Sequence, residues 1–153
     1  MNVNKILFIN ASEHENGGTA RIGRQFLADY DYQQVDLVNY KVYQIGQHFA
    51  DDQFAEVFDQ LTRADEIVLG TPVYWHTISA YLKTLMERIS QLDPSEVNHL
   101  RGKRVFLLVQ GADPSDTIGP ATGLVKRFCQ VLGLDFSGSA STPQTLAELR
   151  NQL

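Results

Sequence analysis

The stretch from Ile67 to Trp75 reads Ile-Val-Leu-Gly-Thr-Pro-Val-Tyr-Trp, and the fold can be worked out from it. It opens on a short apolar run, which is typical of a parallel strand that is buried on both faces of its sheet. Pro72 predicts the end of this strand, because proline has no backbone N–H to donate to a neighbouring strand. Two large aromatic residues, Tyr74 and Trp75, then follow. The stretch therefore predicts a buried strand that leads directly into an aromatic loop.

Two further apolar runs, Lys5–Asn10 and Val105–Val109, have the same character. Segments with apolar residues at helical spacing separate the strands, so that strand and helix alternate five times. This alternation predicts an α/β fold in which a five-stranded parallel sheet lies between two layers of helices, joined by right-handed crossovers. The other strands are expected near Val35 and Leu37 and at Leu134–Ser137. The helices are expected around Ile22–Tyr30, Phe54–Leu61, Ile78–Ile89, Leu124–Leu132 and Thr145–Leu149.

Length and composition fit one globular domain over residues 1–153. Hydrophobic residues make up 43% of the chain and charged residues 20%, so it can bury a core and is not disordered. The net charge of −5 argues against nucleic acid or an anionic membrane as a partner. The sequence shows neither a signal peptide nor an apolar run of about 20 residues. We therefore expect a cytoplasmic protein.

Cysteine usage limits the metal chemistry. Cys129 is the one cysteine of the chain, so an intramolecular disulfide is impossible. Without any Cys-x-x-Cys pair, a cysteine-ligated cluster or zinc site is not expected. The adjacent residues Glu13, His14 and Glu15 point in different directions, and we interpret them as a solvated loop. We expect no metal site.

A doubly wound sheet binds its ligands outside the carboxyl ends of its strands, at the point where the strand order reverses. For the order 2-1-3-4-5, that point lies between the first and third strands. The loop after the first strand contains Gly17, Gly18 and Thr19 at the start of a helix, whose free N–H groups suit a phosphate. The alternative is an ordinary flexible loop in which Thr19 caps the helix.

The loop after the third strand carries Tyr74 and Trp75, and a loop normally stays at the surface. Exposed aromatic side chains there favour a flat ring system as ligand. The alternative is that both pack under a helix or against a second subunit. The loop after the fourth strand contains Gly111, and a glycine there permits close approach to a ring edge. The alternative is that this loop is an ordinary turn marked by Asp113 and Pro114. His76 is interpreted as a solvated polar residue, and no catalytic side chain is predicted.

These loops resemble those of a known family. The run from Thr71 to Lys83 is similar to the signature of flavodoxin-like NAD(P)H-dependent FMN reductases, which reads Ser/Thr-Pro-x-Tyr-Trp, then a small-residue turn and Leu-Lys. The run Asn16–Ala20 resembles the Gly-Asn-Thr-Ala phosphate loop of that family. The resemblance continues in register from about Lys5 to Gly111. It implies a flavodoxin-like three-layer sandwich with strand order 2-1-3-4-5 and FMN as cofactor.

The resemblance assigns three groups of residues to the cofactor. One group would hold the phosphate, one would line the ring system and the ribityl chain, and one would face the other edge of the flavin. They are Ser12, Gly18, Thr19 and Ala20 for the phosphate, Pro72, Val73, Tyr74 and Trp75 for the lining, and Gly111, Ala112 and Asp113 for the edge.

The chain also departs from the family pattern. Related iron–sulfur flavoproteins carry a cysteine cluster after the second strand, whereas Tyr40–Gly46 contains no cysteine, so no cluster is expected. Glu13 and Glu15 stand in the phosphate loop, and Gly18 replaces an asparagine. Each carboxylate would repel a phosphate by about 1 kcal/mol at an exposed site, which predicts modest FMN affinity.

The activity implied by the resemblance is hydride transfer through FMN, from NADH or NADPH to a small acceptor such as a quinone, a flavin, an azo compound or a nitro compound. The family further implies a homodimer or higher homo-oligomer. Two alternatives remain open. One is a flavodoxin-type electron carrier without a substrate of its own, and the other is a flavin-free interaction module.

Overall fold

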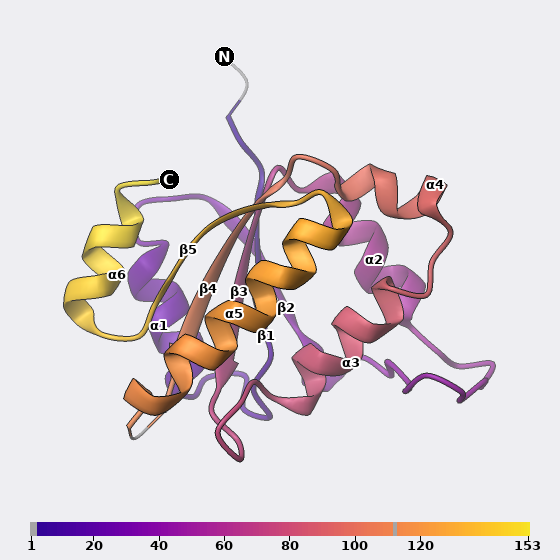
Figure 1. Ribbon diagram of the computed structural model, residues 1–153, viewed down its shortest axis with the longest axis horizontal. Coiled ribbons are helices and arrows are strands. Elements are labelled where there is room, and N and C mark those ends of the chain that lie inside the picture. Colours follow the sequence, from indigo (N-terminus) through magenta and orange to yellow (C-terminus); the bar gives the residue numbers. More distant parts are fainter. Residues whose placement is uncertain (1–2, 112) are drawn as a thin grey trace.

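The computed structural model describes residues 3–111 and 113–153. Parallel strands form one sheet in the order β2-β1-β3-β4-β5, which is the predicted flavodoxin-like order (Figure 1). The third strand ends at Pro72, as the sequence predicts. The strands are β1 (Ile6–Asn10), β2 (Tyr32–Asp36), β3 (Glu66–Pro72), β4 (Arg104–Gln110) and β5 (Asp135–Ala140).

Helices cover both faces of the sheet (Figure 1). One face packs against α1 (Gly18–Phe26) and α6 (Pro143–Arg150). The other face packs against α2 (Phe54–Arg63), α3 (Ala80–Ile89) and α5 (Ser115–Leu132). The shorter segments are η1 (Leu37–Asn39), α4 (Pro94–Val97) and η2 (Asn98–Leu100). In the ranges described, none of the helices combines the length and apolarity needed to cross a bilayer.

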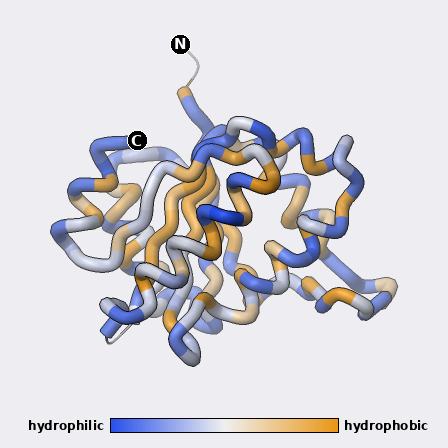
Figure 2. Tube along the Cα trace, in the orientation of Figure 1, coloured by the Kyte–Doolittle hydropathy of each residue, from blue (hydrophilic) through white to orange (hydrophobic). Residues whose placement is uncertain are grey.

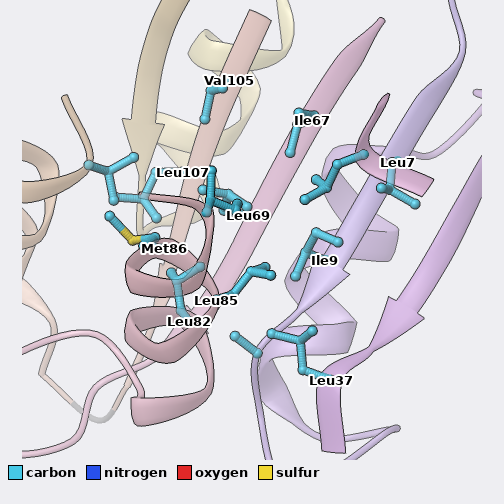
Figure 3. Close-up of a cluster of buried hydrophobic side chains, with 14 of the residues drawn as sticks. Leu7, Ile9, Leu37, Ile67, Leu69, Leu82, Leu85, Met86, Val105 and Leu107 are labelled. Carbon is cyan, nitrogen blue, oxygen red and sulfur yellow. The ribbon is translucent and has the colours of Figure 1, made fainter. Parts of the chain in front are cut away.

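Alternate residues of the central strands supply two cores. Leu7, Ile9, Ile67 and Leu69 join the larger cluster under α2, α3 and α5, where Figure 3 shows them facing Leu82 and other side chains of α3. The intervening positions join the second cluster under α1 and α6, and these include Ile6, Phe8, Val68, Phe106 and Leu108. Figure 2 shows the central strands as the most continuous apolar part of the chain. Burial on both faces explains why these strands read as unbroken apolar runs.

Several elements differ from the sequence-based expectation. Helix α1 spans Gly18–Phe26 where Ile22–Tyr30 was expected, and Leu37 lies in η1 because β2 ends at Asp36. Helix α5 begins at Ser115, well before Leu124, because Gly119, Pro120 and Gly123 interrupt the apolar periodicity without ending the helix. Strand β5 continues to Ala140, through small residues with weak strand propensity. The short helix α4 was not predicted, although a capping box and a proline in its first turn mark its start.

Candidate functional site

The loops that follow β1, β3 and β4 meet at one edge of the sheet. Asn10 at the end of β1 lies opposite Gly70 of β3, and Pro72 at the end of β3 lies opposite Gln110 of β4. The three loops are therefore neighbours at the lower edge of the molecule in Figure 1. This is the reversal point at which ligands bind in doubly wound sheets.

The loop after β1 is braced by Asn10, which is fully buried. Its Nδ2 donates to the His14 carbonyl at 3.2 Å and to Asp36 Oδ1 at 2.8 Å, while its Oδ1 accepts from the Ser12 N–H at 3.3 Å. Ser12 is 4% exposed, and its Oγ accepts from the His14 N–H at 3.1 Å. The sequence-based assignment missed Asn10. The sequence signal that could have identified Asn10 is a polar residue at the end of an otherwise apolar strand.

Helix α1 begins in this loop with an uncapped N-terminus. Its N-cap is Gly17, and no side chain there accepts a hydrogen bond from the first turn. Thr19 lies within the helix, so the alternative in which Thr19 is the cap is wrong. Thr19 is 1% exposed, and its Oγ1 is buried without a hydrogen-bond partner among the described residues.

A buried hydroxyl without a partner is costly, and free N–H groups at a helix start favour an anion. The arrangement around Thr19 therefore fits the phosphate of FMN. Ala20 is fully buried, so it offers no exposed surface to a ligand in this structure.

The loop after β3 is a tight hairpin on a rigid base. The Ser79 N–H donates to Thr71 Oγ1 at 2.9 Å, and Ser79 Oγ caps α3 by accepting from the Leu82 N–H at 3.2 Å. Thr71 and Ser79 are both fully buried. Between them, the Tyr74 N–H donates to the Thr77 carbonyl at 3.0 Å, and the Thr77 N–H donates back to Tyr74 at 3.2 Å. These bonds close a two-residue turn.

The tip of this hairpin holds Trp75 and His76 in left-handed backbone conformations, with φ of 50° and 60°. A two-residue turn with both central residues at positive φ usually contains asparagine, aspartate or glycine, because other side chains are strained there. Trp75 is nevertheless 95% exposed at the tip. The structure thus places the predicted aromatic side chain at the surface, and a strained turn holds it there.

Tyr74 connects this hairpin to the loop after β1. Burial raises the pKa of Tyr74, and the carboxylate of Glu13 raises it further through its charge and a hydrogen bond. Tyr74 therefore keeps its proton at neutral pH and can donate from its hydroxyl. The contact also brings Glu13, an acidic residue of the predicted phosphate loop, next to the aromatic hairpin.

The loop after β4 packs against the hairpin. A Cβ placed on Gly111 would lie 3.2 Å from Cβ and Cγ2 of Val73, so glycine allows this close approach. Asp113 Oδ1 accepts from the Ser115 N–H at 3.2 Å and from Ser115 Oγ at 2.5 Å, which lowers the pKa of Asp113 and orients its carboxylate toward the start of α5. Ala112, also predicted to face the flavin, lies outside the described residues.

Other hollows of the surface lie elsewhere. One of about 470 Å³ is at the amino ends of β1 and β2, lined by Lys5, Tyr32 and Arg63 among others. Within residues 3–111 and 113–153, no three His, Cys, Asp or Glu side chains are grouped so that they could hold a metal ion. The position of the candidate site therefore rests on the three loops.

Comparison with known proteins gives a family match over most of the chain. The model of the family described as NADPH-dependent FMN reductase matches residues 4–141. The Bacillus subtilis protein YwqN, provisionally named as an NAD(P)H-dependent FMN-containing oxidoreductase, is 21% identical over 148 residues, which cover 88% of this chain and 82% of that protein.

An iron–sulfur flavoprotein of Methanocaldococcus jannaschii is 36% identical over 62 residues, which make up 40% of this chain and only 31% of the flavoprotein. Among solved structures, the Trp repressor binding protein from Bacillus subtilis superposes with a TM-score of 0.79 at 17% identity, and 97% of each chain is covered. At this identity the likeness shows that the two share a fold.

Proposed function

The chain belongs to the NADPH-dependent FMN reductase family, and on this premise we propose that it is an FMN-dependent oxidoreductase. It oxidises NADH or NADPH and reduces a small acceptor, for which a quinone, a flavin, an azo compound or a nitro compound is suitable. YwqN, which aligns with 88% of the chain, carries a name of the same class and supports this proposal.

The observation that carries the proposal is the aromatic hairpin. Trp75 is 95% exposed, although a large apolar side chain gains free energy when it is covered. Its backbone is strained as well, and strain in a folded protein concentrates at functional sites. A flat ring system held against the hairpin would cover the indole and account for both features.

Each loop has a role in this arrangement. The N-terminus of α1 and Thr19 Oγ1 would hold the phosphate, while Val73, Tyr74 and Trp75 would line the ring system. Bound FMN supplies the hydride chemistry, and the protein supplies orientation. Tyr74 keeps its proton at neutral pH, because burial raises its pKa, so its hydroxyl is available as a donor.

Titration of the purified protein with FMN tests the proposal, followed by steady-state oxidation of NADH and NADPH with a quinone as acceptor. We expect the wild-type protein to bind FMN and to turn over at least one of the nicotinamides. Trp75→Ala should weaken FMN binding about tenfold, since the ring loses its stacking surface. Phe49→Ala is the matched control, because Phe49 is also an exposed aromatic residue but lies outside the three loops.

Three results would contradict parts of this proposal. Failure of the wild-type protein to bind FMN would leave a flavin-free interaction module. FMN binding without nicotinamide oxidation would indicate an electron carrier. Unchanged FMN binding by the Trp75 variant would remove the hairpin from the site. The homodimer or higher homo-oligomer expected from the resemblance stays a prediction.

A further inference from the structure

Gln110, the last residue of β4, joins the three loops of the site. Its carbonyl accepts a hydrogen bond from the Val73 N–H at 2.9 Å, and Pro72 is its partner in the sheet. The backbone of Gln110 is therefore held firmly against the loop after β3. Its side chain extends the other way, toward the first residue of α1.

The side chain of Gln110 occupies space that a side chain at position 18 would need. A Cβ built on Gly18 would lie 2.6 Å from both Cδ and Nε2 of Gln110, and 3.0 Å from its Oε1. A contact this short is impossible for a real Cβ, so the carboxamide can sit against α1 only because residue 18 is glycine. Among the described residues, the carboxamide has no hydrogen-bond partner.

Two observations bear on how this corner of the site would hold a phosphate. Thr19, the next residue of α1, has a buried Oγ1 without a partner in the described part of the chain. The loop from Ala11 to Gly18 contains no lysine or arginine and carries Glu13 and Glu15 instead. The nearest basic residues in the sequence are Arg21 and Arg24, which lie within α1. The loop itself offers an anion only neutral donors, and a carboxamide beside it adds two N–H groups without a charge.

We propose that the carboxamide of Gln110 binds the phosphate end of FMN, beside a loop that contributes no basic residue of its own. This inference rests on the proposed function, because it concerns the same cofactor. It adds a binding residue and a reason for Gly18: glycine at that position admits the carboxamide to the N-terminus of α1.

The test compares FMN with riboflavin, which has the same ring system and lacks the phosphate. Gln110→Ala should weaken FMN binding about five- to tenfold, the loss expected for one hydrogen bond, and should leave riboflavin binding unchanged. Binding is measured by quenching of flavin fluorescence, so the result does not depend on turnover.

Gly18→Ala provides a second route to the same result. The added methyl group displaces the carboxamide, which is the end of a flexible side chain, so the stability of the fold should change little. FMN binding should fall about as much as in Gln110→Ala, within the same range for one hydrogen bond. In the Gln110→Ala background, Gly18→Ala should have no further effect, because nothing remains to be displaced. Gly123→Ala in α5 is the matched control, since a Cβ there meets no atom within 4 Å.

Each outcome supports or overturns the proposal. A selective loss of FMN binding in both single variants, with no additional loss in the double variant, supports it. Unchanged FMN binding by Gln110→Ala overturns it, and so does an equal loss of FMN and riboflavin, which would assign Gln110 to packing or to the ring. If the wild-type protein binds no FMN, the proposed function fails together with this inference. If it binds FMN and Gln110→Ala has no effect, only the inference fails.

Discussion

At the scale of single residues, the site is marked by side chains in costly positions. Trp75 and His76 adopt positive φ in a turn that usually contains asparagine or glycine. Thr19 buries a hydroxyl without a partner among the described residues. Each arrangement lowers the stability of the protein alone, and a bound ligand would relieve the exposure of the indole and the isolation of the hydroxyl.

His76→Gly tests whether the hairpin tip is strained. A left-handed conformation costs a residue with a Cβ about 1–2 kcal/mol, and glycine avoids this cost while losing more chain entropy on folding. We therefore expect the free energy of unfolding of the FMN-free protein to rise by about 0.5–1 kcal/mol, measured by urea denaturation. FMN affinity should be retained, because the substitution leaves the side chain of Trp75 in place.

Gly46→Ala is the converse control, since Gly46 has φ of 88° with no atom within 4 Å of an added Cβ. It should lower stability through backbone strain alone. A loss of stability in His76→Gly would show that the imidazole makes a stabilising contact that outweighs the strain.

At the scale of elements, one ion pair fixes the segment between η1 and α2. Asp52, just before α2, pairs with Arg88 near the end of α3, with N–O distances of 2.5 and 3.2 Å. The same guanidinium donates to the Tyr43 carbonyl at 2.7 Å and lies over the ring of Phe54. The side chains of Asp52 and Arg88 are only 24% and 18% exposed. Asp52 therefore joins the two helices and holds the intervening segment against them.

Asp52→Asn should lower the free energy of unfolding by about 1–3 kcal/mol, because a half-buried guanidinium loses its charged partner. Asp51→Asn is the matched control. Asp51 pairs with Lys41 at an exposed position, and exposed pairs contribute little. Urea denaturation of the three proteins at neutral pH makes the comparison, and equal stability of both variants would contradict the assigned role.

The ion pair of Asp52 and Arg88 also predicts how the stability of the protein changes with pH. The hydrogen bond with Arg88 lowers the pKa of Asp52 below its ordinary value of 3.8. In the unfolded chain the carboxyl binds its proton at a higher pH than in the folded protein. The contribution of Asp52 is therefore complete above pH 3.8 and is lost as the pH falls below it. In Asp52→Asn this part of the acid destabilisation should be absent.

At the scale of the whole molecule, close packing of α1 on the sheet positions the site. Gly23 in α1 lies directly over Phe8 of β1, so that an added Cβ would be 2.3 Å from Cε1 and Cζ of the ring. Phe8 is fully buried and belongs to the core under α1 and α6. The distance between α1 and the sheet thus depends on Gly23, which has no side chain. The position of the uncapped N-terminus of α1 depends on the same distance.

Gly23→Ala should lower the free energy of unfolding by about 1–3 kcal/mol through overpacking. It should also weaken FMN binding, because the N-terminus of α1 shifts with the helix. Gly123→Ala in α5 adds a methyl group to a helix that has room for it, so it should leave stability and FMN binding close to wild type. Unfolding in urea and FMN titration measure both effects. A Gly23 variant as stable as wild type would show that α1 and Phe8 can adjust at no cost.

The sequence by itself determined the alternation of strands and helices and the position of the three loops. This was possible because burial on both faces leaves apolar runs, and because Pro72 and the aromatic pair after it mark a strand end directly. The start of α5 could not be predicted from the sequence, because Gly119 and Pro120 weaken the apolar pattern of a helix that tertiary packing maintains.

Only the tertiary structure decided which polar groups meet at the site. The residues that meet there are far apart in the sequence, and no sequence pattern pairs them. They are Asn10 with Asp36, Glu13 with Tyr74, and Gly18 with Gln110. Parallel strand pairing brings the ends of β1, β3 and β4 to one edge, and the side-chain contacts there depend on distances of a few ångströms. Periodicity records which face of an element is buried and carries no information on such contacts.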